Sequence, residues 1–150
     1  MINGRMEYII QLLISELEKT AQLHVSNYET SESKALFTID PLNRLSIEVE
    51  ENGIAVLYSD EHDEFWLKPY KDEDAFIKDV TRFVLDLLQN TVLMEHVYSG
   101  DTLLCYKIWI VDKAKKHKRF LKKVTVSPNP LLRLKPKTIQ IKELHFTSRT

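Results

Sequence analysis

The chain has 150 residues and a formal net charge of −1, with 43% hydrophobic and 29% charged residues and only three glycines and five prolines. This composition excludes a disordered chain, and the length suits one domain with one core. The single cysteine, Cys105, excludes an internal disulfide, and no Cys/His spacing typical of structural zinc is present. We therefore expect one folded domain over residues 1–150, in the reducing cytoplasm, without a metal or another cofactor.

The first segment predicts an amphipathic helix over residues 5–23, because apolar residues recur there at spacings of three and four. Asn3 is the expected N-cap. Tyr8, Leu12 and Ile14 widen the apolar arc, which indicates two neighbours for this helix. One of them is a second helix or another chain, so a homodimer stays open. Residues 1–7 do not begin a signal peptide, and no stretch resembles a membrane span.

Strands follow the polar residues 25–34. A short strand is expected at 36–39, and apolar residues then alternate over 45–49 and 54–58 around Asn52-Gly53, which predicts a tight hairpin. Residues 59–64 indicate a charged loop, followed by an edge strand over 65–67 that Pro69 ends.

The second half repeats the order of helix and strands. Acids at 72–74 open an expected helix over 73–90, and strands at 92–98 and 103–111 flank a turn at Ser99-Gly100-Asp101. In the strand 103–111 the residues that point to either face are largely apolar, so this strand should be central and covered on both faces. Further strands are expected at 120–126 and 138–146. The fold class is therefore α+β, with an antiparallel sheet built from hairpins and two main helices, about 5–23 and 73–90, packed on it.

The charge is segregated along the chain. Residues 1–112 hold 9 Lys and Arg against 21 Asp and Glu, a net of −12, whereas residues 113–150 hold 12 against 1, a net of +11. The near-neutral total thus conceals an acidic body and a basic C-terminal part. Such segregation is typical of recognition surfaces and says little about the fold.

The acidic stretch at residues 60–64 is the first candidate site. Its carboxylates surround His62 but match neither a calcium loop nor a zinc motif, so a solvated loop is favoured over a metal site. Acids beside aromatic anchors are a common composition for binding a basic protein. The proposed protein-binding residues are Asp60, Glu61, Asp63, Glu64, Trp66 and Tyr70.

The basic stretch 113–123 is the second candidate site, expected at the tip of a hairpin and along its returning strand. As a nucleic-acid-binding surface it would use Lys113, Lys115, Lys116, Lys118, Arg119, Lys122 and Lys123. No known nucleic-acid-binding motif supports this interpretation, and the acidic body would repel a polyanion. A third interpretation pairs these cations with acids at 60–64 or 72–74, in the same or a neighbouring copy.

Catalysis has one weak candidate. If Gly100-Asp101 forms a two-residue turn, His96 faces Cys105 across the hairpin, close enough to activate a thiolate. A buried, unreactive cysteine is the more common case in an apolar strand. We expect no enzyme here.

The sequence therefore favours a small non-catalytic protein-binding protein that uses an acidic face bearing aromatic residues. In general composition it is similar to bacterial immunity proteins that mask a basic active site, and to small adaptors and chaperones, but no motif carries that likeness. The alternative is a nucleic-acid-binding module that uses the basic hairpin 113–123.

Overall fold

The computed structural model describes residues 3–23, 28–112, 114 and 117–147. The chain has a mixed α+β fold with antiparallel sheets, and it divides into two compact units. Unit 1 comprises residues 1–88 and 146–150, and unit 2 comprises residues 89–145. Unit 1 holds 9 Lys and Arg against 18 Asp and Glu, a net of −9, and unit 2 holds 12 against 4, a net of +8. The two units are therefore opposite in net charge, although residues 89–112 of unit 2 still hold 1 Lys against 3 Asp and Glu, so the sign of the charge along the sequence changes at residue 113.

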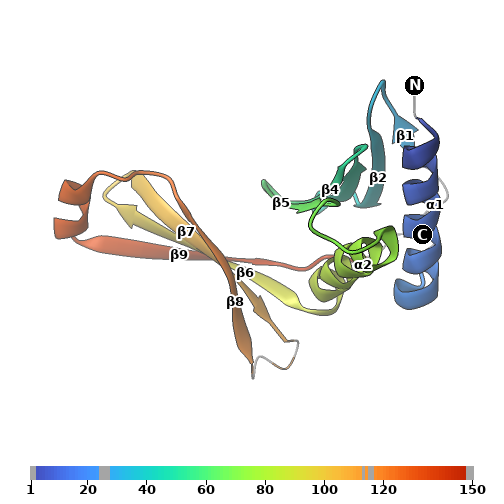
Figure 1. Ribbon diagram of the computed structural model, residues 1–150. Coiled ribbons are helices and arrows are strands. Elements are labelled where there is room, and N and C mark those ends of the chain that lie inside the picture. Colours follow the sequence, from blue (N-terminus) through green and yellow to red (C-terminus); the bar gives the residue numbers. More distant parts are fainter. Residues whose placement is uncertain (1–2, 24–27, 113, 115–116, 148–150) are drawn as a thin grey trace. The chain divides into compact units, whose positions relative to one another are not determined.

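Unit 1 contains two helices and a five-stranded sheet in the order β1-β2-β3-β4-β5 (Figure 1). The helices are α1 (Gly4–Ala21) and α2 (Glu73–Gln89), and the strands are β1 (Glu29–Thr30), β2 (Ala35–Asp40), β3 (Leu45–Val49), β4 (Gly53–Tyr58) and β5 (Glu61–Trp66). Asn3 caps α1 as expected, because its Oδ1 accepts a hydrogen bond from Met6 N at 2.9 Å. Asp72 caps α2 in the same way, through Ala75 N at 2.8 Å.

One face of this sheet forms the core of unit 1. Alternate residues of β2, β3 and β4 are fully buried there, and both helices lie on that side (Figure 1). Ring contacts fix α2 against β4 and β5, since Phe83 lies 5.9 Å from Tyr58 and 5.5 Å from Phe65 between ring centroids. The residues of these strands on the opposite side are mostly half-buried or exposed, and neither helix covers that side; they include Leu36, Thr38, Ser46, Glu48, Ala55 and Leu57.

The β3–β4 hairpin forms as expected, but its turn lies one residue earlier than the sequence suggested. Glu50 N donates to Gly53 O at 2.8 Å, so Glu51 and Asn52 are the central residues and Gly53 belongs to β4. Neither Asn52 nor Gly53 has a positive φ. Gly53 is instead needed because a Cβ there would lie 3.0 Å from both Phe65 O and a ring carbon of Trp66.

Unit 2 is a four-stranded antiparallel sheet in the order β8-β7-β6-β9. Its strands are β6 (Thr91–Ser99), β7 (Thr102–Val111), β8 (Lys118–Thr125) and β9 (Lys137–Leu144), with a short 3-10 helix, η1 (Pro130–Leu134), before β9. The turn at Gly100-Asp101 joins β6 to β7, and Gly100 has the positive φ of 59° that this turn requires. β7 is an interior strand as expected, but only Leu104, Ile108 and Ile110 are buried, and its other residues are half-buried or exposed.

Two differences from the expected elements change the position of candidate residues. Residues 61–64, expected to lie in a loop, belong to strand β5, which pairs along its whole length with β4. The strands also form two sheets and not one. Neither helix, within the part of the chain that the structure describes, has both the length and the apolar composition needed to cross a bilayer.

Candidate functional site

The candidate site is the face of the unit 1 sheet that carries no helix, here called the open face. Register places cross-strand neighbours on it, including Glu48 opposite Ala55 and Ala55 opposite Glu64. Its centre is made of half-buried apolar residues of β2 and β4. The residues that form the open face and its rim are Lys34, Leu36, Ser46, Glu48, Glu50, Ala55, Leu57, His62, Glu64 and Trp66.

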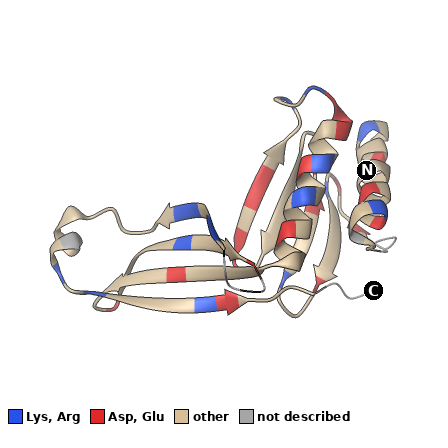
Figure 2. Cartoon of the chain, turned by 90° about the horizontal axis from the view of Figure 1, so that it is seen from below, with Lys and Arg blue, Asp and Glu red and all other residues tan. Residues whose placement is uncertain are grey.

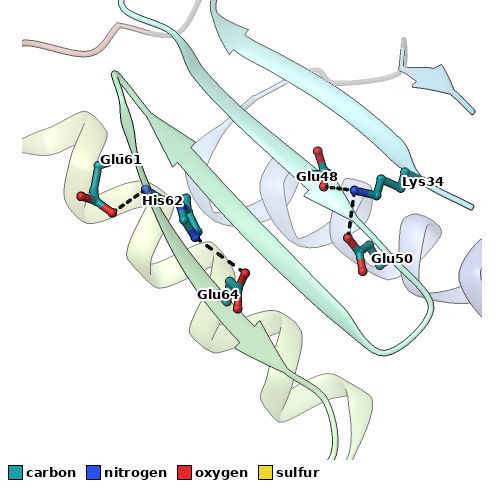
Figure 3. Close-up of polar contacts among 6 residues, drawn as sticks. All are labelled: Lys34, Glu48, Glu50, Glu61, His62 and Glu64. Carbon is teal, nitrogen blue, oxygen red and sulfur yellow. Dashed lines mark hydrogen bonds and ion pairs between the residues drawn. The ribbon is translucent and has the colours of Figure 1, made fainter.

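Charged groups of the open face interact at its surface (Figure 3). Lys34 Nζ lies 3.1 Å from Glu48 Oε1 and 3.3 Å from Glu50 Oε1, and these bonds, that to Glu48 first, raise the pKa of Lys34 above its ordinary value. His62 Nε2 lies 3.7 Å from Glu64 Oε1. With three carboxylates against one lysine and one histidine, the group of five is net acidic, so the open face attracts cations.

Trp66 provides an aromatic anchor beside these carboxylates. It ends β5 opposite Gly53, its indole lies against that glycine, and 52% of the residue is exposed. A hollow beside it is lined by Glu50, Ala55 and Glu64 among others. Because the glycine leaves room for the ring, the indole lies on the sheet with one side covered while it presents an apolar surface to solvent.

The structure divides the acidic residues predicted as a site between two faces of β5. Glu64 and Trp66 lie on the open face together with His62, whereas Glu61 and Asp63 face the helix side. Glu61 is buried, and Asp63 Oδ2 accepts a hydrogen bond from Tyr58 OH at 2.5 Å. Asp60 lies in the turn before β5 and pairs with Arg44 at 2.6 Å. The six residues therefore do not form one surface, because neighbouring residues of a strand point in opposite directions.

Tyr70 also lies apart from the open face. Its hydroxyl donates to Asp79 Oδ2 at 3.0 Å, and its ring stands 5.3 Å from that of Phe76 on α2. Burial, and then the Asp79 carboxylate, raise the pKa of Tyr70 above its ordinary value of 10.0. Its contacts indicate a role in joining the segment after β5 to α2.

Glu48 and Glu50 were not among the site residues predicted from the sequence, although the alternation of residues in their strand indicated which face they lie on. They alternate with Ile47 and Val49, so their place opposite the buried face follows from the period of a strand. What the local sequence could not give is the pairing of β3, β4 and β5, which brings Glu48 and Glu50 beside Glu64 and Trp66.

The cations of the basic stretch lie on both faces of β8. Register sets Lys118 and Lys123 on one face, and Arg119 and Lys122 on the other. Lys118 Nζ is 2.7 Å from Glu95 Oε1 and 4.2 Å from the centroid of the Trp109 ring. Lys113, Lys115 and Lys116 lie outside the described residues. Figure 2 shows how the charged residues are distributed over the strands.

The proposed pair of Cys105 and His96 does not form. A bulge between Val97 and Tyr98 shifts the register, so His96 lies opposite Tyr106 and Cys105 lies opposite Val97. A shift of one residue turns the two side chains to opposite faces of the sheet. Among the described residues, no three His, Cys, Asp or Glu side chains are grouped so that they could hold a metal ion.

No protein-family model, curated protein or solved structure matches this chain. The open face combines carboxylates, a half-buried apolar centre and one fixed indole, which is chemistry suited to binding a cationic surface through charge and aromatic contact.

Proposed function

We propose that this protein is a non-catalytic binding protein whose open face holds a basic protein partner. The observation that carries the proposal is the exposed indole of Trp66, fixed on Gly53 beside Glu50 and Glu64. Tryptophan is enriched among the residues that dominate binding energy, and surrounding charges select the partner and speed its association. Immunity-type proteins that mask a basic active site belong to this class, as do adaptors and chaperones.

Neutralising the carboxylates of the open face tests this function. In the triple variant Glu48→Gln, Glu50→Gln and Glu64→Gln we expect the protein to retain less of its partner from a lysate of its native host. We expect the affinity for the purified partner to fall by roughly tenfold, mainly through slower association, because rim charges act on the association rate. Retained proteins are identified by mass spectrometry, and rates by surface plasmon resonance.

The matched control removes the same charge from the helices. Glu7→Gln, Glu18→Gln and Asp74→Asn lie on α1 and α2, where all three residues are exposed. We expect this variant to bind as the wild type does. Equal loss in both variants, or none in the first, would show that the open face is not the binding surface.

Nucleic-acid binding by unit 2 is a second candidate, favoured by one observation. Lys118 lies over the Trp109 ring, and Phe120 packs edge-on against that ring at 5.0 Å, so cations and aromatic rings meet on one face of β7 and β8. Unit 2 also carries a net charge of +8. Cations beside aromatic rings are the usual means of holding a single strand.

A salt titration with single-stranded and duplex oligonucleotides tests this second function. If Lys118 and Lys123, which lie on the same face as Phe120, each neutralise one phosphate, the logarithm of the affinity for a single strand should fall with that of the salt concentration at a slope of about −1.4. Lys118→Gln and Lys123→Gln together should bring this slope close to zero. Absence of binding at low salt in fluorescence anisotropy would eliminate this function.

A further inference from the structure

The last strand of unit 2 is an exposed edge. β9 pairs with β6 on one side only, and seven consecutive residues, 137–143, are exposed. Two of them are large and apolar, Ile139 at 60% and Ile141 at 62% exposure. A long edge strand with exposed apolar residues offers unpaired backbone groups to another strand, and natural sheets usually protect such edges.

The other long edge strands carry that protection. β8 has four cations among its eight residues, and β5 has three acids among its six, so each places like charges close together if it pairs with a copy of itself. β9 has charges of both signs, Lys137, Lys142 and Glu143. Of these three edge strands, β9 alone has an order of residues that favours pairing with the same strand of a second copy.

The sequence of β9 is complementary to itself in the antiparallel direction. When Gln140 is set opposite Gln140 of a second copy, Lys137 faces Glu143 and Ile139 faces Ile141, each pair occurring twice. Lys142 then faces the uncharged Thr138. A two-fold axis perpendicular to the sheet keeps equivalent faces on the same side, so the ion pairs and the isoleucine pairs share one face.

One cross-strand row of that face is apolar within one copy, whereas in the next row Ile141 lies opposite Glu95. Ile139 lies opposite Val97 of β6, Val97 lies opposite Cys105 of β7, and all three are half-buried or exposed. Pairing two β9 strands therefore extends an apolar row across the junction, with isoleucine side chains as direct cross-strand neighbours. Glu143 Oε2 lies 3.5 Å from His145 Nε2 within one copy, and Lys137 of the second copy adds a full positive charge beside it.

We propose that two copies of this chain associate through antiparallel β9–β9 pairing centred on Gln140, which joins two four-stranded sheets into one of eight strands. The interface uses backbone hydrogen bonds for affinity, the isoleucine pairs for apolar contact and the Lys137–Glu143 pairs for register. It lies within unit 2 and does not involve helix α1, whose wide apolar arc suggested a dimer from the sequence. The proposal is independent of the partner-binding function of unit 1.

Charge reversal tests the register. In Lys137→Glu, two glutamates face each other at both ends of the interface, and in Glu143→Lys two lysines do, so we expect each variant to dimerise at least about tenfold more weakly than the wild type. The double variant K137E/E143K restores opposite charges and should return to within about threefold of the wild type. An equimolar mixture of the two single variants should form heterodimers, because every pair is then opposite in charge. Sedimentation equilibrium measures the constants, and native mass spectrometry identifies the heterodimer.

Cross-linking tests the centre of the pairing in full-length chains that carry Cys105→Ser. A cysteine introduced as Gln140→Cys faces its own copy and should be joined rapidly by a short bismaleimide. The matched control Thr138→Cys alone should not react in this way, because its copies are offset by four residues, about 13 Å along the strands. Mixing T138C with K142C should restore cross-linking between the two different chains.

Several outcomes would overturn the proposal. A wild-type chain that stays monomeric at the highest concentration it tolerates eliminates the dimer. A dimer that the single reversals leave intact, or that the double variant fails to restore, uses another surface. Circular dichroism of each variant confirms that loss of the dimer is not loss of the fold.

Discussion

Replacing Asp40 with alanine is expected to lower the free energy of unfolding by about 3 kcal/mol. The carboxylate is fully buried at the end of β2 and accepts hydrogen bonds from Asn43 N at 3.3 Å, Asn43 Nδ2 at 2.8 Å, Thr147 N at 2.8 Å and Thr147 Oγ1 at 3.4 Å. Alanine removes the acceptor of all four and leaves their donors without it. Hydrogen bonds to a charged group are each worth more than neutral ones, so losing this set of four should be costly.

The measurement is a urea titration followed by circular dichroism. Asp40→Asn keeps one acceptor oxygen and should fall between the wild type and the alanine variant. Asp60→Asn is the matched control, because that carboxylate is exposed and its ion pair with Arg44 is worth about 0 to 1 kcal/mol. A loss of under 1 kcal/mol in Asp40→Ala would contradict the assigned role.

Hydrogen exchange gives a second readout of the same residue. Asp40 is the polar link between β2 and residues 146–147, and Phe146 packs beside it, its ring 6.5 Å from that of Tyr58 at 90°. Without the Asp40 carboxylate we expect faster exchange at Thr147 N than in the wild type, while β6 stays protected. Residue 147 is thus tied to the sheet of unit 1 through a buried acid.

Local pattern predicted most of the elements but not their grouping. The period of α1 and α2, the alternation of Leu45, Ile47 and Val49, and the turn at Gly100-Asp101 are all short-range signals, and each formed close to its expected residues. The division into two sheets depends on which strands meet, and residue periodicity carries no information on that. The register bulges beside Val97 and Trp109 depend on the same long-range pairing.

The sequence predicted only part of the candidate site, because the rest also depends on long-range strand pairing. Residues 60–64 are so highly charged that a loop was expected, yet they form strand β5, in which Asp63 and Phe65 find partners on the helix side and Glu61 accepts a hydrogen bond from His62 N. Composition cannot reveal that Asp63 will meet the hydroxyl of Tyr58. Tertiary context outweighed the low strand propensity of acids. Trp66, assigned to the site from the sequence, does lie on the open face.

Replacing Trp66 with alanine is expected to weaken binding of the basic partner by roughly 100-fold, about 3 kcal/mol. The indole is the largest exposed apolar group on the open face, and a bound cationic side chain could lie over its ring while Glu50 and Glu64 neutralise the charge. Trp66→Phe keeps a ring with a smaller and weaker π surface, so we expect it to lose less. Titration calorimetry with the purified partner measures each constant.

Two further variants test whether binding depends on the position of the Trp66 ring as well as on its presence. Tyr8→Ala removes an aromatic residue that is 56% exposed on α1, away from the open face, and should leave the affinity unchanged. Gly53→Ala keeps Trp66 but places a methyl group 3.0 Å from its ring and from Phe65 O, so the indole must move. If the fixed position of the ring matters, G53A should weaken binding even where circular dichroism shows the fold intact. If neither W66A nor G53A changes the affinity for the partner, Trp66 is not the anchor, even if the carboxylates contribute to binding.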